Sequence, residues 1–427
     1  MALFRTIPPP VRDAPFIDHV DWAARRDPIG HQVHLCLAML ALVLIPLSST
    51  LATIGSTALF FYAALRAPTI HRTWRPVTGN AAFLLLLGLF GWLALSLIWS
   101  SDPGYGFRLL RGSRYLLLVP ALLPLLRHGR LLLLAMCAGV FIQNIAQWFE
   151  TDGTGGLSEH AGHTALWFTL AIATLILLPS DGSGSRSAHF RRCLAAIPMI
   201  GIVLSTARSA LLGSGVGLTT GMALAWVRRR NDRAGAVMSG CLVIMLGIAL
   251  SLSPSTPINE GMHEALDAAG AATEMDVTTH QDQVRPLWWR IGIDALKRNP
   301  VRGEGLGSSA NTINNDPEVL AITEGGTRNQ YVMRDDYHSL FVSVAADAGV
   351  IGVGLLLGWL TLLAIQIFRS GPYDAILLAG LVSFLVYSTF NTTLFSGRLV
   401  AFAAILMAFS TCRIPHQKTV REAVHHP

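Results

Sequence analysis

The sequence predicts an all-α, polytopic integral membrane protein. Of its 427 residues, 52% are hydrophobic and only 14% are charged, whereas roughly 25% are charged in an average soluble domain. The apolar residues gather into blocks of about 16 to 20, the length of helix that crosses a hydrocarbon core about 30 Å thick. In lipid, every backbone N–H and C=O group must be bonded within the protein, so such blocks cross as α-helices. Soluble enzymes are thereby excluded as a class.

Twelve apolar blocks are expected to form transmembrane helices, nine before a long polar segment and three after it. Their approximate bounds are 31–48, 50–66, 81–100, 109–126, 131–149, 164–179, 193–206, 209–227, 235–253, 339–368, 374–391 and 399–412. Residues 1–30 are polar and interrupted by prolines, so the first helix is expected to be an uncleaved anchor. The predicted organisation is helices one to nine within 31–253, a loop at 254–337, and helices ten to twelve within 338–412.

The distribution of basic residues predicts the orientation in the membrane. With the N-terminus in the cytoplasm, seven cytoplasmic segments hold 20 of the 32 Lys and Arg residues. The opposite orientation would place these clusters outside, against the tendency of Lys and Arg to stay on the cytoplasmic side. We therefore expect residues 1–30 and the tail 413–427 to be cytoplasmic. The net charge of +6 follows from this topology and does not indicate nucleic-acid binding.

One loop, 254–337, is too long to be a simple connection. It contains 13 Asp and Glu residues against 7 Lys and Arg residues, and it is expected on the outer side of the membrane. Helical patterns occur at 262–272 and at 286–299. Long loops outside regular structure usually carry function. This loop is therefore expected to contribute to a functional site.

A second group of outer residues consists of arginines at or near membrane depth: Arg108, Arg111 and Arg114 at the start of the fourth helix, and Arg208 between the seventh and eighth. Ionisable groups are costly there and are functional candidates. The first three are spaced three apart, so they share one helix face. One guanidinium group can bind two phosphate oxygens at once. The alternative is that this stripe pairs with acidic residues of the outer loops.

The pattern at 286–299 begins near a proline and ends before Asn-Pro, as a short helix does. It brings Arg285 and Arg290 beside Trp288 and Trp289, which we expect at the membrane interface. The arginines are candidates for binding an anionic substrate. They could equally extend along the tryptophans as an interfacial anchor.

A glycine-rich turn follows this helix, with Gly303, Gly305 and Gly307 at alternate positions. Closely spaced glycines allow backbone to approach a ligand phosphate. The same spacing also occurs in ordinary tight turns. Both interpretations stay open from the sequence.

His338 opens the tenth apolar block and is expected at the outer membrane surface, where it could accept a proton. Alternatively it is a hydrogen-bonded structural residue. Asp335 and Asp336 could cap the following helix or hold a metal ion with His338. His160 and His163 form another possible pair on an outer loop. We expect no metal site, because the arginines already supply positive charge and no second acidic pair lies at a suitable spacing.

Taken together, these motifs resemble the bacterial O-antigen ligase family, within a group that includes O-antigen polymerases and bacterial protein O-oligosaccharyltransferases. The resembling segments are Thr206-Ala-Arg208-Ser-Ala-Leu-Leu-Gly213, Arg285 with Trp289, Pro300 followed by Gly303-x-Gly305-x-Gly307, and His338-Ser339 followed after nine residues by Gly349-Val-Ile-Gly352. The histidine pattern is the most specific of them. Glu304 departs from the apolar residue that is common in relatives, which argues against direct phosphate binding by this turn.

The resemblance implies a GT-C-type, inverting glycosyltransferase that uses neither a metal nor another cofactor. It would lie in the bacterial inner membrane and transfer O-antigen glycan from undecaprenyl diphosphate to a sugar hydroxyl of lipid A-core, on the periplasmic side. The loop at 254–337 would then be periplasmic. The implied partners are the two lipid-linked substrates and membrane lipids, with no nucleic acid.

The chemistry of that reaction suggests a role for each candidate residue. A neutral imidazole suits removal of the acceptor proton, so His338 is predicted to be the general base. Fixed arginines stabilise the charge that develops on a diphosphate leaving group, a role predicted for Arg208 and Arg285. The second group of candidates binds donor diphosphate or lipid A phosphates and comprises Arg290, Arg108, Arg111, Arg114, Gly303, Gly305 and Gly307.

Two alternatives remain at this stage. A polymerase or a protein O-oligosaccharyltransferase of the same group would differ only in its acceptor; the histidine pattern and the single large late loop favour a ligase. A lipid or solute transporter would belong to another class. Transporters place polar groups and broken helices near the bilayer midplane, whereas here the polar groups collect at one face.

Overall fold

The computed structural model describes residues 10, 14–149, 157, 161–179, 184–204, 208–228, 281–324 and 336–411. These residues form α-helices and short 3-10 helices, with no strand among them, so the predicted all-α fold is confirmed. The predicted helices at 235–253 and 262–272 lie outside the described residues.

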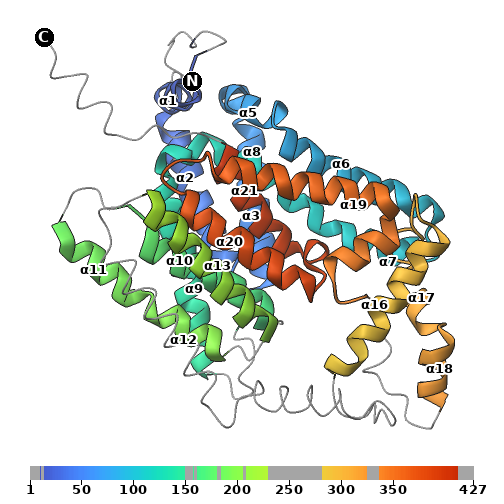
Figure 1. Ribbon diagram of the computed structural model, residues 1–427. Coiled ribbons are helices and arrows are strands. Elements are labelled where there is room, and N and C mark those ends of the chain that lie inside the picture. The colour runs from blue at the N-terminus through green and yellow to red at the C-terminus, as the bar shows by residue number, and fades with distance from the viewer. Residues whose placement is uncertain are drawn as a thin grey trace, which may run out of the picture.

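Figure 1 shows the helices packed side by side, with α1 at one end and α16 and α18 toward the other. The α-helices are α1 (Phe16–Arg26), α2 (Pro28–Leu44), α3 (Ser49–Leu65), α4 (Ala67–Ile70), α5 (Arg75–Thr78), α6 (Ala81–Ser96), α7 (Pro103–Leu110), α8 (Leu118–Leu122), α9 (Gly129–Phe149), α10 (Ala161–Leu177), α11 (Gly184–Leu194), α12 (Ala196–Leu204), α13 (Arg208–Arg228), α16 (Gln281–Arg298), α17 (Ser309–Asn314), α18 (Pro317–Glu324), α19 (Leu340–Ile367), α20 (Asp374–Thr389) and α21 (Gly397–Thr411). The 3-10 helices are η1 (His71–Trp74), η2 (Leu97–Trp99), η3 (Arg111–Leu117), η4 (Leu123–His128) and η5 (Thr393–Phe395).

Several helices are apolar and long enough to cross a membrane. Within the described part of the chain, four pass a test of length and composition: Ala81–Trp99, Pro103–Phe149, Ser209–Arg228 and Leu340–Ile367. A fifth is possible if α1 and α2, which are bent by 111° at their junction, form one broken span. Four more apolar helices are shorter, namely Ser49–Leu65, Gly162–Leu177, Asp374–Thr389 and Gly397–Thr411. The chain is therefore a multi-pass membrane protein by composition and helix length.

Polar residues between the apolar blocks set where helices begin. In each case a side-chain oxygen accepts a hydrogen bond from a backbone N–H that has no partner inside the first turn. The capping residues are Asp27 before α2, Ser48 before α3, Asn80 before α6, Asp102 before α7 and Ser339 before α19. The last of these caps directly follows His338, so it also orients the histidine at the start of α19.

Basic residues of the predicted cytoplasmic segments contact α1 or its junction with α2. Arg66 forms an ion pair with Asp27, at 2.9 Å between Nε and Oδ2. Arg127 pairs with Asp21 of α1, and the guanidinium of Arg72 lies over the ring of Trp22. These segments therefore meet at one end of the helix bundle, called the α1 end below.

A ridge of glycines sets the position of α13 against α20. The two helices pack closely along their length, and a Cβ added at Gly213, Gly217 or Gly221 would come within 3.0 Å of α20 atoms. Glycines spaced four apart let two membrane helices approach in this way. Because Gly221 faces Ala375 and Gly213 faces Ser383, the helices are antiparallel. The beginning of α13, at Arg208, therefore lies beside the end of α20.

The predicted helix at 286–299 is longer than expected, because α16 begins at Gln281 and includes Pro286 in its second turn. Pro286 is the sixth residue of α16, so it lies inside the helix and removes the hydrogen bond that an N–H there would give to the carbonyl of residue 282. Inside α16, the ring of Trp288 is fully buried in a small core with Ile313, Val319 and Tyr337. This core attaches α16 to α17, α18 and the start of α19.

Candidate active site

His338 occupies an unusual backbone conformation just before α19. Its φ angle is +49°, in the left-handed region that few residues other than glycine adopt. Its N–H donates to Asp336 Oδ1 at 2.7 Å, and its Nδ1 lies 3.5 Å from the same oxygen. Its ring lies 5.0 Å from that of Trp288 in α16. Backbone and ring are thus both held by neighbours, as is typical of a strained functional residue.

A chain of hydrogen bonds links this segment to the beginning of α13. The N–H of Leu340, two residues after His338, donates to Asn391 O at 3.1 Å. The side chain of Asn391 donates to Ser209 Oγ, also at 3.1 Å. Since Ser209 follows Arg208 in the chain, the backbone of Arg208 lies near the His338 segment. The side chain of Arg208 is outside the described part of the structure.

Arg285 joins the same region from α16. It is partly buried, three residues before Trp288, which contacts His338. The ring of Trp289, also in α16, lies 6.2 Å from that of Phe390 at the end of α20, three residues after Tyr387. The segments predicted to carry Arg208, Arg285 and His338 are therefore neighbours, although more than 50 residues separate each from the next in sequence.

Arg290, also in α16, contacts a different helix. Its guanidinium forms an ion pair with Glu318 of α18, and both side chains are about half exposed. The hydrogen bond to Glu318 raises the pKa of Arg290 above its ordinary value, so this side chain stays charged. A substrate phosphate would have to compete with Glu318 for it.

In the described part of the chain, the contacts of the arginine stripe do not include His338. Arg108, Arg111 and Arg114 are all exposed, and none forms an ion pair within the described part of the chain. Arg114 donates to Thr53 Oγ1 at 2.7 Å and lies over the ring of Tyr115. The backbone changes from α-helix to 3-10 helix at Arg111, which aligns Arg111 and Arg114 more closely because side chains three apart eclipse there.

All three glycines of the turn after α16 lie against backbone atoms of other segments. Gly303, Gly305 and Gly307 have φ angles of +70°, +95° and +94°. A Cβ at Gly305 would lie 2.7 Å from the backbone of Ser100, and one at Gly307 would lie 2.4 Å from Asp102 O. These glycines thus allow the turn to pack on the connection between α6 and α7. Their role in binding phosphate stays a prediction.

The same turn is bonded to a kink in α19. Gly349 has φ +64° inside that helix, which releases carbonyl groups from the helical pattern. Glu304 N donates to Ala346 O at 2.8 Å, and Gly305 N donates to Asp347 O at 3.0 Å. Two motifs that the sequence shows separately, the glycine turn and the glycine after the histidine, therefore form one packed unit that holds the start of α19.

We expect Gly307→Ala to destabilise the protein by more than about 2 kcal/mol, because alanine disfavours this φ value and its Cβ would collide with backbone. Thermal unfolding of the purified protein, followed by tryptophan fluorescence, checks this. Gly354→Ala is the matched control, since nothing lies within 4 Å of a Cβ there. Equal unfolding temperatures for the two variants would contradict the packing role of the turn.

Sequence reasoning did not identify Asn391, Tyr387 or Arg398. Asn391 was detectable as the polar end of an apolar block, whereas Tyr387 and Arg398 gave no pattern that pointed to the site. Arg398 is 4% exposed and donates to Ile45 O at 3.2 Å. It joins α21 to the connection after α2.

The described residues contain no group of three or more His, Cys, Asp or Glu side chains that could hold a metal ion. Asp335 and His160 lie outside these residues. His163 is described; its Nδ1 lies 3.4 Å from Ser396 Oγ, and its ring packs edge-on against Tyr387. The site therefore consists, in its described part, of an imidazole, one neighbouring carboxylate and a nearby guanidinium.

A comparison with known protein families finds a match that covers this site. Residues 193–357 match the family model described as O-antigen ligase. The matched segment includes His338, Arg285, Arg208 and the glycine turn, so the family resemblance predicted from the motifs is confirmed. No curated protein sequence matches the chain.

Proposed function

We propose, from the O-antigen ligase domain at residues 193–357, that the protein transfers O-antigen glycan from undecaprenyl diphosphate to a sugar hydroxyl of lipid A-core. The observation that carries this proposal is the convergence of the His338 segment, the Arg285 region of α16 and the start of α13 at one place. A base and two guanidinium groups are what an inverting transfer from a diphosphate requires.

In the proposed reaction, the acceptor oxygen attacks the anomeric carbon while the bond from that carbon to the diphosphate oxygen breaks. His338 accepts the hydroxyl proton. Asp336 approaches Nδ1, which favours the tautomer with a proton on Nδ1 and a lone pair on Nε2. Nε2 would therefore take the proton, and Asp336 would stabilise the resulting imidazolium.

Arg285 and Arg208 are proposed to stabilise the charge on the departing undecaprenyl diphosphate. A guanidinium binds two phosphate oxygens at once, and in a site with little water this interaction is stronger than in bulk solvent. Charge stabilisation by these two guanidinium groups requires no metal ion. Arg290, the stripe at Arg108, Arg111 and Arg114, and the turn at Gly303, Gly305 and Gly307 are proposed as secondary contacts to substrate phosphates.

The proposed topology places this site on the periplasmic side of the bacterial inner membrane, with both termini in the cytoplasm. It is supported by the gathering of Arg66, Arg72 and Arg127 at the α1 end, as expected for cytoplasmic basic residues. We further propose twelve membrane spans and a GT-C-type architecture, with the loop at 254–337 in the periplasm.

The test is transfer by the purified protein in detergent, given diphosphate-linked glycan and lipid A-core in the presence of EDTA. We expect a lipid A-core band of lower mobility on a gel. Lengthened donor glycan with unchanged lipid A-core would instead identify a polymerase. Activity that returns only when Mg²⁺ is restored would contradict the metal-independent mechanism and implicate Asp335 and Asp336.

A further inference from the structure

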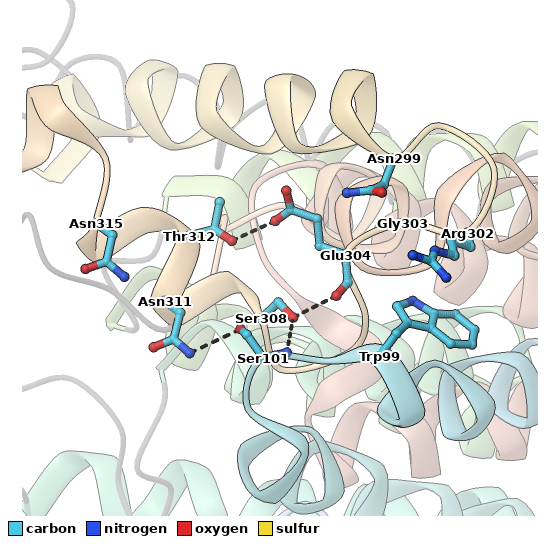
Figure 2. Close-up of a pocket in the computed structure, with 10 residues that line it drawn as sticks. All are labelled: Trp99, Ser101, Asn299, Arg302, Gly303, Glu304, Ser308, Asn311, Thr312 and Asn315. Carbon is cyan, nitrogen blue, oxygen red and sulfur yellow. Dashed lines mark hydrogen bonds between the residues drawn. The ribbon is translucent and has the colours of Figure 1, made fainter.

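A polar pocket lies beside α17, next to the small core that contains Tyr337. It has a volume of about 380 Å³ and is lined by Trp99, Ser101, Asn299, Arg302, Gly303, Glu304, Ser308, Asn311, Thr312 and Asn315. Figure 2 shows that these side chains come from the end of α16, the following turn, α17 and the connection after α6. None of them is a proposed catalytic residue; Gly303 belongs to the turn proposed as a secondary contact to substrate.

The floor of the pocket is held by hydrogen bonds. Glu304 accepts from Thr312 Oγ1 at 2.7 Å through one carboxylate oxygen and pairs with Arg298 Nη2 at 2.7 Å through the other. Ser308 Oγ donates to Glu304 O at 2.9 Å and accepts from Ser101 N at 3.0 Å. These bonds are drawn in part in Figure 2. The pocket is thus fixed in shape before any ligand enters it.

The rim carries polar groups whose bonding capacity the protein does not use. The side chains of Asn299 and Asn315 form no hydrogen bond within the described part of the chain. The guanidinium of Arg302 lies over the ring of Trp99, 5.6 Å from its centroid, and it has no ion-pair partner among the described residues. The rim therefore offers amide donors, amide acceptors and guanidinium donors together.

We infer that this pocket binds a section of uncharged sugar chain. A sugar hydroxyl both donates and accepts hydrogen bonds, and a side-chain amide does the same. A few convergent polar groups in a preformed pocket are the usual means of orienting a ligand. A phosphate would fit less well than a sugar, because it would face the carboxylate of Glu304 and, having no donor of its own, would leave the amide oxygens unpaired.

The pocket is connected to the proposed catalytic histidine by a short path. Tyr337, the residue before His338, packs in one small core with Ile313, which follows the pocket residue Thr312. Burial raises the pKa of Tyr337, so its hydroxyl stays protonated. His338 is the next residue in the chain. The pocket and the His338 segment are therefore attached to the same small core.

This inference rests on the proposed function, which supplies two sugar chains: the glycan of the donor and the core oligosaccharide of the acceptor. The probes are O-glycan released from its diphosphate, core oligosaccharide released from lipid A, and inorganic phosphate. We expect one sugar probe to bind the full-length protein in calorimetry. Arg302→Ala/Asn315→Ala should weaken that binding about tenfold, the effect of losing one or two hydrogen bonds.

Lys297→Ala is the matched control, because Lys297 is 70% exposed on α16 and does not line the pocket. It should leave binding unchanged. In the transfer assay, the double variant should raise KM for the lipid-linked form of the same sugar by a similar factor, with kcat nearly constant. The substrate whose KM rises identifies the chain that the pocket holds.

The outcomes separate the two proposals. Sugar binding that depends on Arg302 and Asn315, in a protein without transfer activity, would support the proposed sugar pocket and overturn the proposed function. Normal transfer with unchanged KM in the double variant would overturn the pocket. Failure of both sugar probes to bind, or displacement of a bound sugar by inorganic phosphate, would also overturn it.

Discussion

His338→Ala is expected to lower the rate of glycan transfer by about 10²- to 10⁴-fold, the usual contribution of a general base. Without the imidazole, the acceptor hydroxyl keeps its proton as it attacks the anomeric carbon. The measurement is the initial rate of lipid A-core modification by purified protein, normalised to the amount of folded protein in the assay. Transfer at the normal rate would exclude His338 as the base.

The backbone of His338 requires a second variant, because a loss of activity could come from a changed turn. Asparagine tolerates positive φ better than alanine does, but it cannot accept the proton. We therefore expect His338→Asn to keep the local structure and to be as inactive as His338→Ala. If His338→Asn were active while His338→Ala was not, the histidine would be needed for the conformation at φ +49° and not for proton transfer.

Arg285→Ala and Arg208→Ala are each expected to lower transfer by about 10²- to 10³-fold, because the diphosphate charge would lose a fixed donor pair. Lysine at either position should restore only part of the activity, since it keeps the charge but cannot bind two oxygens at once. Rates at saturating substrate check this, because a loss in kcat indicates an interaction made in the transition state.

Arg290→Ala is the comparison for these variants, on the same helix as Arg285. Its guanidinium is already paired with Glu318, so its removal is expected to have a smaller effect, within about tenfold, since exposed ion pairs contribute little. Full activity in both Arg208→Ala and Arg285→Ala would refute the diphosphate role. An equal loss in all three variants would point to a general effect of positive charge.

The glycine motifs show how far local sequence could predict the site. Gly303, Gly305 and Gly307 were recognised as a turn that permits close approach of backbone, and their positive φ angles agree with this. What approaches them could not be predicted, because the sequence does not show that Ser100 and Asp102 lie against this turn. The partners come from a different part of the chain.

The sequence by itself determined the helical class, the membrane character and the resemblance to the O-antigen ligase family, because each depends on properties local to a segment: apolar length, basic flanks and short motifs such as His338-Ser339 with Gly349. Only the tertiary structure decided which segments meet. The start of α13 lies near the His338 segment because its glycines pack on α20, and the polar pocket exists because α17 packs on the α6–α7 connection. Contacts of this kind depend on shape and register between distant segments, and a single sequence does not encode them in any local pattern.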